Sequence, residues 1–228
     1  LRRAQSTWGR LATFSGIATA LRKSAVESVG RFPAEMATED IALAWQLQTR
    51  FHDVRYEPRA VFAMQVPETL GQWWRQRTRW ARGLGQVLQR NRHVTTSWQK
   101  RRLWPVYAEA ALSSIWSLLF VVAVVIWAFA YASGVYNLGA NPIPNFWGVL
   151  MAGVLTVQIA CGLWLDGRYD PAVRRYAVWL PLYPLAYWGL NTLASARGTL
   201  PGFVRRPSGT VTWNSERYLA EEPEVAPT

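Results

Sequence analysis

The sequence predicts a mixed α/β soluble segment followed by a membrane-associated α-helical region. No charged residue occurs from Ala110 to Leu165, and a second uncharged run covers Tyr176 to Ala196. Because a bilayer core needs about 20 apolar residues per helix, these runs have room for two or three transmembrane helices. Residues 1–68, by contrast, mix apolar and charged side chains as soluble domains do.

Composition and charge narrow the classes of partner. The chain has 228 residues, enough for one or two domains, and a formal charge of +11. The cations gather beside the predicted spans, so we expect the lipid bilayer, and no nucleic acid, as their partner. The single cysteine, Cys161, excludes a disulfide framework. The chain starts at Leu1 without a visible signal peptide, and we expect it to be the C-terminal part of a longer protein.

Residues 1–68 are expected to alternate strands and helices. A short apolar strand precedes a predicted helix over Lys23–Val29, which Gly30 stops. Thr38 is a suitable N-cap for a second helix, whose apolar residues follow at helical spacing. Residues 53–66 alternate enough for one or two strands, broken at Pro58.

Residues 69–104 predict an amphipathic helix that lies at the membrane interface. A helical pattern runs from Pro67 to about Val94, and its apolar stripe consists of Leu70, Trp73, Trp80, Leu84, Val87 and Leu88. Every charged residue between Gly71 and Trp104 is Lys or Arg. A basic, tryptophan-rich helix of this kind is typical of anionic lipid surfaces.

Residues 105–200 predict the transmembrane region, and residues 201–228 a polar tail. Two spans are expected, at about 110–131 and 146–165, joined by an uncharged turn on the outside. The third apolar segment contains Pro181 and Pro184, which kink or break helices. If it crosses the membrane, the tail lies outside; if it does not, the tail lies in the cytoplasm.

The acidic tripeptide Thr38-Glu39-Asp40 has two interpretations. Acids in the first turn of a helix are common, because they complement the helix dipole. A carboxylate at a helix start can also face a cleft and act as a general base toward an attacking hydroxyl. The tripeptide alone leaves both interpretations open.

Gln76, Arg79 and Trp80 share one helix face, because they stand at positions i, i+3 and i+4. A guanidinium can bind a diphosphate through two parallel hydrogen bonds, and an indole ring can stack beneath a sugar. The alternative is that Arg79 meets lipid head groups and Trp80 packs on lipid or protein.

The order of the motifs is more specific than any one of them. The chain contains FSG at 14–16, TED at 38–40, PET at 67–69 and QRTRW at 76–80, all before the charge-free spans. This arrangement resembles the processive family 2 glycosyltransferases, which make cellulose, chitin, hyaluronan and poly-N-acetylglucosamine. The sequence is most similar to the bacterial poly-β-1,6-N-acetylglucosamine synthases. The resemblance implies the C-terminal half of a GT-A domain, then the interfacial helix and the transmembrane helices.

The resemblance also implies roles for residues of the soluble segment. Asp40 corresponds to the catalytic base that deprotonates the acceptor hydroxyl, and Thr38 and Glu39 to the residues that shape its surroundings. Ser15 and Gly16 correspond to a stretch beside the acceptor end of the polymer. The implied reaction is a single inverting displacement in which UDP leaves.

The basic motif corresponds to the donor and acceptor contacts of such enzymes. Gln76 and Arg79 are implied to hold the donor diphosphate, and Trp80 to stack beneath the acceptor sugar. Cations placed at a leaving diphosphate stabilise the charge that develops there. Mg²⁺ or Mn²⁺ is expected for the full enzyme, with its acidic ligands upstream of Leu1; Asp166 and Asp170 do not match that pattern.

The resemblance implies a multi-pass protein of the bacterial inner membrane with a cytoplasmic catalytic part. A UDP-sugar donor, a polysaccharide acceptor and a small accessory membrane subunit are the implied partners. Residues 208–213 resemble the loop that closes over UDP in cellulose synthases, which favours a cytoplasmic tail. Poly-N-acetylglucosamine synthesis from UDP-GlcNAc and export for the biofilm matrix is the leading hypothesis. The alternatives are cellulose, chitin or hyaluronan synthesis, or a non-catalytic membrane scaffold.

Overall fold

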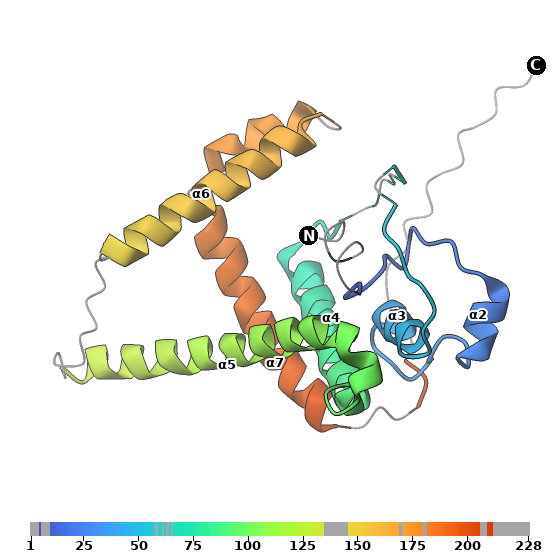
Figure 1. Cartoon of the computed structure of the whole chain (residues 1–228). Coiled ribbons are helices and arrows are strands. Elements are labelled where there is room, and N and C mark those ends of the chain that lie inside the picture. Colours follow the sequence, from blue (N-terminus) through green and yellow to red (C-terminus); the bar gives the residue numbers. More distant parts are fainter. Residues whose placement is uncertain are drawn as a thin grey trace, which may run out of the picture.

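The computed structural model describes residues 5, 10–57, 59–60, 62, 64, 66–134, 146–168, 171–179, 182–205 and 209–211. Its helices are α2 (Lys23–Ser28), α3 (Glu39–Thr49), α4 (Leu70–Arg90), α5 (Trp104–Ala132), α6 (Phe146–Asp166) and α7 (Gly189–Val204). Shorter turns are η1 (Arg92–Val94), η2 (Trp98–Leu103), η4 (Pro171–Trp179) and the π-helical η5 (Pro184–Trp188). Figure 1 shows α2 and α3 at one end of the molecule, with α5 extending away from them.

We call residues 10–57 the N-terminal module. Its core surrounds Trp45 of α3, which is 1% exposed. Its ring meets the ring of Tyr107 edge-on, with centroids 6.0 Å apart. Leu43 of α3, Val87 of α4 and Val106 of α5 complete the buried cluster with it. The start of α5 is therefore packed against the N-terminal module.

Two polar side chains of α3 fix the chain that precedes it. Trp45 Nε1 donates to the carbonyl of Ala12 at 2.9 Å. Gln48 is buried, donates to the carbonyl of Leu11 at 2.8 Å and accepts from its N–H at 2.9 Å. These bonds hold the segment that leads to Gly16 beside α3.

The predicted helix at Lys23–Val29 is confirmed as α2, and Gly30 follows it with φ +91°. The strands expected before Lys23 and over residues 53–66 are wrong for the residues described there, which contain no strand. A strand needs a neighbouring strand for its backbone hydrogen bonds, and the described part of the chain offers none. Pro58 itself lies outside the described residues.

The helix predicted from Pro67 to about Val94 forms α4, which ends at Arg90. It begins with a capping box, in which the Thr69 hydroxyl accepts from the N–H of Gln72 and the Gln72 side chain returns to Thr69. The expected apolar stripe is buried only toward the end of α4, where Val87 is 0% exposed. Leu70 at the start of α4 is 64% exposed, whereas Trp73 of the same stripe meets the ring of Tyr187 edge-on, with centroids 5.8 Å apart.

Helix α7 packs along α4 and also contacts α5. Glycines permit the close approach: a Cβ at Gly85 of α4 would overlap the backbone of Thr199, and one at Gly202 of α7 would overlap the carbonyl of Arg82. Gly198, one helical turn before Gly202, similarly lies against the carbonyl of Thr78. Small residues spaced in this way let two helix backbones approach each other.

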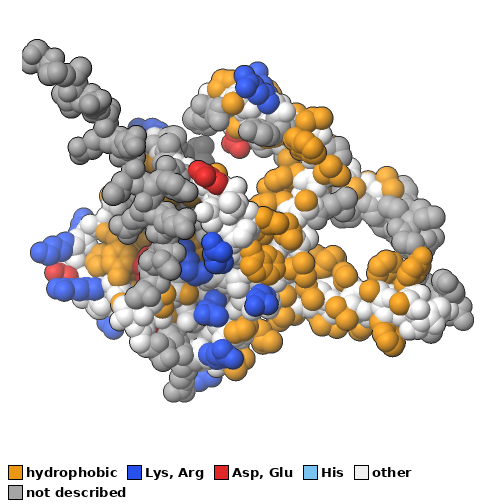
Figure 2. All heavy atoms as spheres, turned by 180° about the vertical axis from the view of Figure 1, so that it is seen from behind, with side chains coloured by type: hydrophobic (Ala, Val, Ile, Leu, Met, Phe, Trp, Pro, Cys, Tyr) orange, Lys and Arg blue, Asp and Glu red, His pale blue; other side chains and the backbone are white. Residues whose placement is uncertain are grey.

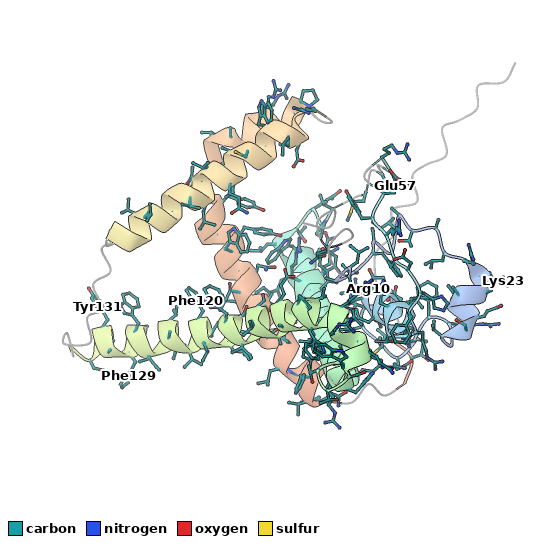
Figure 3. The ribbon with its side chains drawn as sticks, in the orientation of Figure 1. Arg10, Lys23, Glu57, Phe120, Phe129 and Tyr131 are labelled. Atoms are coloured by element: carbon teal, nitrogen blue, oxygen red, sulfur yellow. The ribbon has the colours of Figure 1, made fainter. Side chains whose placement is uncertain are left out.

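Within the described ranges, one helical stretch, Trp98–Ala132, is long and apolar enough to cross a membrane, and Ala152–Asp166 is a shorter apolar helix. The first predicted span therefore has a matching helix of sufficient length, and α6 covers residues 146–165 of the second. In Figure 3, Phe120, Phe129 and Tyr131 project from α5, far from Lys23 of the module. The predicted outer turn at 135–145 lies outside the described residues.

The third apolar segment does not form one continuous helix. It is divided among η4, η5 and α7, and η5 begins at Pro184. Proline lacks a backbone donor and clashes with the preceding turn, which explains a break at this point. Pro181 and residues 212–228 lie outside the described residues, but Val211 N–H donates to the carbonyl of Ala34 at 2.9 Å. Residue 211 thus lies against the N-terminal module.

Candidate active site

The structure places Asp40 beside Gly16. A Cβ at Gly16 would lie 3.3 Å from Asp40 Oδ2, a tight contact that the carboxylate could relieve only by shifting a few tenths of an ångström. The other oxygen, Oδ1, accepts from the N–H of Ile41 at 2.8 Å. Because Ser15 adjoins Gly16, the two sequence-predicted groups, 15–16 and 38–40, come together at the first turn of α3.

Thr38 is the N-cap residue of α3, but its side chain does not cap the helix as expected. The residue is 3% exposed, and its Oγ1 has no hydrogen-bond partner among the described residues. The hydroxyl instead lies against Gly83 of α4, where a Cβ would overlap it. The contact with α4 therefore sets the Thr38 rotamer, and the capping prediction is wrong.

Helix α4 holds both backbone groups of Ala37, the residue before the acidic tripeptide. The Ala37 N–H donates to Gln86 Oε1 at 2.9 Å, and its carbonyl accepts from Arg79 Nη1 at 3.0 Å. Gln86 is buried, so the first bond is shielded from water. Arg79 and Gln86 thereby fix the start of α3 relative to α4.

Arg79 interacts electrostatically with both acidic residues of the tripeptide, Glu39 and Asp40. Burial lowers the pKa of Arg79, while the negative charges of Glu39 and Asp40 act in the opposite direction. A guanidinium stays protonated at physiological pH under such a shift. The structure thus brings a partly buried cation near two carboxylates, and all three lie at the α3–α4 contact.

Gln76 and Trp80 lie one turn apart on α4, and the Trp80 ring belongs to an aromatic cluster. The guanidinium carbon of Arg77 lies 4.6 Å from the Trp80 ring centroid and 5.6 Å from those of Trp73 and Tyr187. Sequence reasoning missed Arg77 and Tyr187. Arg77 stands inside the quoted motif and could have been considered, but Tyr187 comes near only through the folding of η5 onto α4.

A second group of arginines lines an open cavity of about 660 Å³ between α4 and α7. They are Arg75, Arg79 and Arg82 of α4, with Arg197 of α7 and Arg205 at its end. Figure 2 shows Lys and Arg side chains gathered where the module meets the apolar helices. The sequence motif indicated Arg79 alone, because nothing local signals that α7 returns to α4.

The described residues do not form a binding site for the expected Mg²⁺ or Mn²⁺. Within them, no three His, Cys, Asp or Glu side chains lie close enough together to hold a metal ion. Glu39 and Asp40 are two carboxylates near a cation, which does not favour a divalent metal.

Comparison with known proteins agrees with the motif order. The glycosyl transferase family group 2 matches residues 1–190. The chain is 32% identical over 222 residues to a poly-beta-1,6-N-acetyl-D-glucosamine synthase of Staphylococcus epidermidis, covering 94% of this chain and 53% of that protein. A synthase with the same name from Staphylococcus aureus strain COL is 32% identical over 217 residues, covering 94% and 53%.

This chain spans about half the length of the curated relatives it matches. No solved structure matches it. The family match covers most of the chain and includes the FSG, TED, PET and QRTRW motifs, so the predicted resemblance is confirmed. The chain belongs to the glycosyl transferase family group 2.

Proposed function

We propose that this protein is an inverting, processive glycosyltransferase that polymerises N-acetylglucosamine from UDP-GlcNAc. The contact of Asp40 with Gly16, close to the cationic Arg79, carries the proposal. A base for the acceptor hydroxyl and a cation for the leaving diphosphate are the two groups that a single displacement needs. The names of the curated relatives favour N-acetylglucosamine over other sugars.

In the proposed reaction, the acceptor hydroxyl attacks the anomeric carbon of the donor sugar. The new C–O bond forms as the bond from that carbon to the diphosphate oxygen breaks, and UDP leaves with the electron pair. Asp40 takes the hydroxyl proton, with its direction set by Gly16 and by the N–H of Ile41. Arg79 offsets charge on the departing diphosphate, and Trp80 supports the acceptor sugar.

Membrane export belongs to the same proposal. The apolar stretch Trp98–Ala132 is long enough to span a bilayer, and α4 presents a basic surface to its interface. The bond from Val211 to Ala34 keeps residue 211 on the side of the module, which favours two crossings and a cytoplasmic tail. The family resemblance alone supports three further parts of the proposal. They are a Mg²⁺ or Mn²⁺ ion, a small accessory membrane subunit and a location in the bacterial inner membrane.

The decisive experiment uses the full-length protein in membrane vesicles with labelled UDP-GlcNAc, UDP-glucose and UDP-glucuronate, each offered separately. Polymer is expected from UDP-GlcNAc alone. Asp40→Asn should lower synthesis by about 10²-fold or more, because the general base is lost. Asp53→Asn is the matched control, since that carboxylate is exposed and paired with Arg55 at 2.6 Å.

Each outcome decides between the proposals. Full synthesis by Asp40→Asn would overturn the catalytic role and favour a non-catalytic scaffold. Polymer from UDP-glucose or UDP-glucuronate would keep the reaction and change the product to one like cellulose or a uronate-containing chain. Equal losses in Asp40→Asn and Asp53→Asn would contradict a specific base at Asp40.

A further inference from the structure

The arginine pocket between α4 and α7 contains more cations than the recognised motif supplies. Of the five arginines that line it, only Arg79 belongs to the Gln-x-x-Arg-Trp pattern. Arg75 and Arg82 stand one turn to either side of Arg79 on α4, so the three share a face. Arg197 and Arg205 approach from α7 and its end.

Most of this positive charge has no protein partner. Among the described residues, Arg75, Arg82, Arg197 and Arg205 have no carboxylate within ion-pair distance. Glu35 is the one acidic residue on the described wall, and it already pairs with Arg90 at 2.7 Å. The cavity therefore holds uncompensated cations that repel one another unless an anion joins them.

The two helices are held too closely for the arginines to separate freely. Gly198 lies against Thr78, and Gly202 against the carbonyl of Arg82, so α7 has a fixed position on α4. Arg197 directly precedes one of these contacts, and Arg205 follows the other by three residues. The backbone positions that carry these arginines are therefore set before a ligand arrives, and only the side chains have to be ordered when it binds.

The residue types match phosphate chemistry. Guanidinium groups form paired hydrogen bonds with phosphate oxygens, which a single ammonium does not. Trp74 and Pro201 add apolar surface to the same cavity, so a ligand with a phosphate part and an apolar part fits the wall. Arg75, Arg82, Arg197 and Arg205 are all exposed and can be reached from solvent.

We propose that this arginine pocket binds phosphate groups that together carry at least two negative charges, and that Arg197 and Arg205 are binding residues in it. Two sources have this chemistry: the diphosphate of a sugar nucleotide, and two neighbouring head groups of anionic phospholipids at the interface, each with one phosphate charge. The first source rests on the proposed function, and the second does not. In either case α7 supplies ligand contacts from outside the motif.

The test uses the full-length protein, purified in detergent and in phosphatidylcholine nanodiscs. UDP and inorganic pyrophosphate are the soluble probes in calorimetric titrations, and uridine is the control without phosphate. Native mass spectrometry of the detergent sample with added phosphatidylglycerol measures the retained lipid. Arg197→Gln/Arg205→Gln is compared with Lys23→Gln/Arg50→Gln, which removes the same charge from exposed positions outside both the pocket and the basic region 69–104.

Loss of two charge-assisted contacts should weaken the relevant ligand about tenfold or more in the pocket variant, with little change in the control variant. Weaker UDP and pyrophosphate binding identifies a soluble diphosphate, whereas loss of retained phosphatidylglycerol identifies a lipid head group. Arg197→Lys/Arg205→Lys keeps the charge and should retain part of the affinity. Equal binding of every probe by the pocket and control variants would overturn the proposal.

The proposed function can fail separately. Asp40→Asn should still bind the phosphate ligand while losing synthesis. If Asp40→Asn still synthesises polymer, the catalytic proposal fails and the pocket stands. If Asp40→Asn is inactive but the pocket variant binds like its control, only the pocket proposal fails.

Discussion

The guanidinium of Arg77 lies over the ring of Trp80, 4.6 Å from its centroid. Its Nε is buried without a hydrogen-bond partner among the described residues, so aromatic faces are its main surroundings. Such contacts contribute about 1–2 kcal/mol when they are shielded from water. Arg77 is therefore placed to hold the Trp80 ring in one orientation.

Replacing Arg77 by Gln should allow the Trp80 ring to adopt other orientations, because the cation over its face is removed. Full-length Arg77→Gln is expected to make shorter polymer in membrane vesicles while the KM for the donor stays unchanged, because Trp80 is assigned to the acceptor. Arg77→Lys should restore part of the length, since a cation remains. A change in donor KM with normal polymer length would contradict this positioning role; Arg92→Gln, at an exposed site, is the control.

Thr38→Val should raise stability. The Thr38 hydroxyl is buried without a partner, so an apolar replacement of similar shape removes a desolvation cost of about 1 kcal/mol. Thr49→Val is the opposite case on the same helix, because the Thr49 hydroxyl donates to the carbonyl of Gln46 at 2.9 Å. Thermal unfolding of the purified protein should give a higher midpoint for the first variant and a lower one for the second. A lower midpoint for Thr38→Val would indicate that its hydroxyl has a partner.

Gly202→Ala should separate α4 from α7. The new methyl group would overlap the Arg82 carbonyl, and overpacking of this kind costs about 1–3 kcal/mol. Gly153→Ala on α6 is the matched control, since nothing lies within 4 Å of its Cβ position. A helix gains up to about 1 kcal/mol from that exchange alone. The thermal unfolding midpoint should fall for Gly202→Ala and should not fall for Gly153→Ala. If both midpoints changed in the same direction, the close contact between α4 and α7 would be contradicted.

The ion pair of Glu35 with Arg90 should depend on pH. The pKa of Glu35 is lowered chiefly by its own backbone N–H and further by Arg90, against an opposing effect of burial. Because the folded-state pKa lies below the unfolded one, the stability contribution is present above the ordinary pKa and is lost as pH falls through the lowered value.

Glu35→Gln should therefore cost less than about 1 kcal/mol at neutral pH, as expected for an exposed pair, and nothing in strong acid. Unfolding midpoints of the variant and the unchanged protein at pH 7 and pH 3 measure this. Arg90→Gln should lose the same increment at pH 7. An equal loss from Glu35→Gln at both pH values would show that the charge is not responsible.

Local signals in the sequence predicted the parts of the fold that depend on neighbours in the chain. The helical spacing after Thr38 and the stop at Gly30 lie within single elements, and α3 and α2 follow them. The hydroxyl of Thr38 was misjudged because its partner surface, Gly83, comes from another helix. The strands expected over 53–66 depend on neighbouring strands that the described chain lacks.

In the candidate site, too, residues within sequence motifs could be predicted, whereas residues that approach from distant elements could not. The motif order indicated residues 15–16, 38–40 and 76–80, and the structure brings Gly16 against Asp40 and puts Arg79 within electrostatic range of that carboxylate. Arg197 could not be assigned, because its segment was expected either to cross the bilayer or to lie at its surface. Its place beside Arg82 depends on the glycine contacts between α4 and α7, which no local pattern reveals.

The hydrogen bonds from α4 to the backbone of Ala37 couple the position of α4 to that of α3. Gln86 and Arg79 hold the two backbone groups of Ala37, so a tilt or shift of α4 must carry the first turn of α3 with it. The basic, tryptophan-rich composition of α4 predicts a position at the bilayer interface, where a helix responds to membrane thickness and lateral tension. The rate of the chemical step should then vary with lipid acyl-chain length, and vesicles made from lipids of graded chain length provide the measurement.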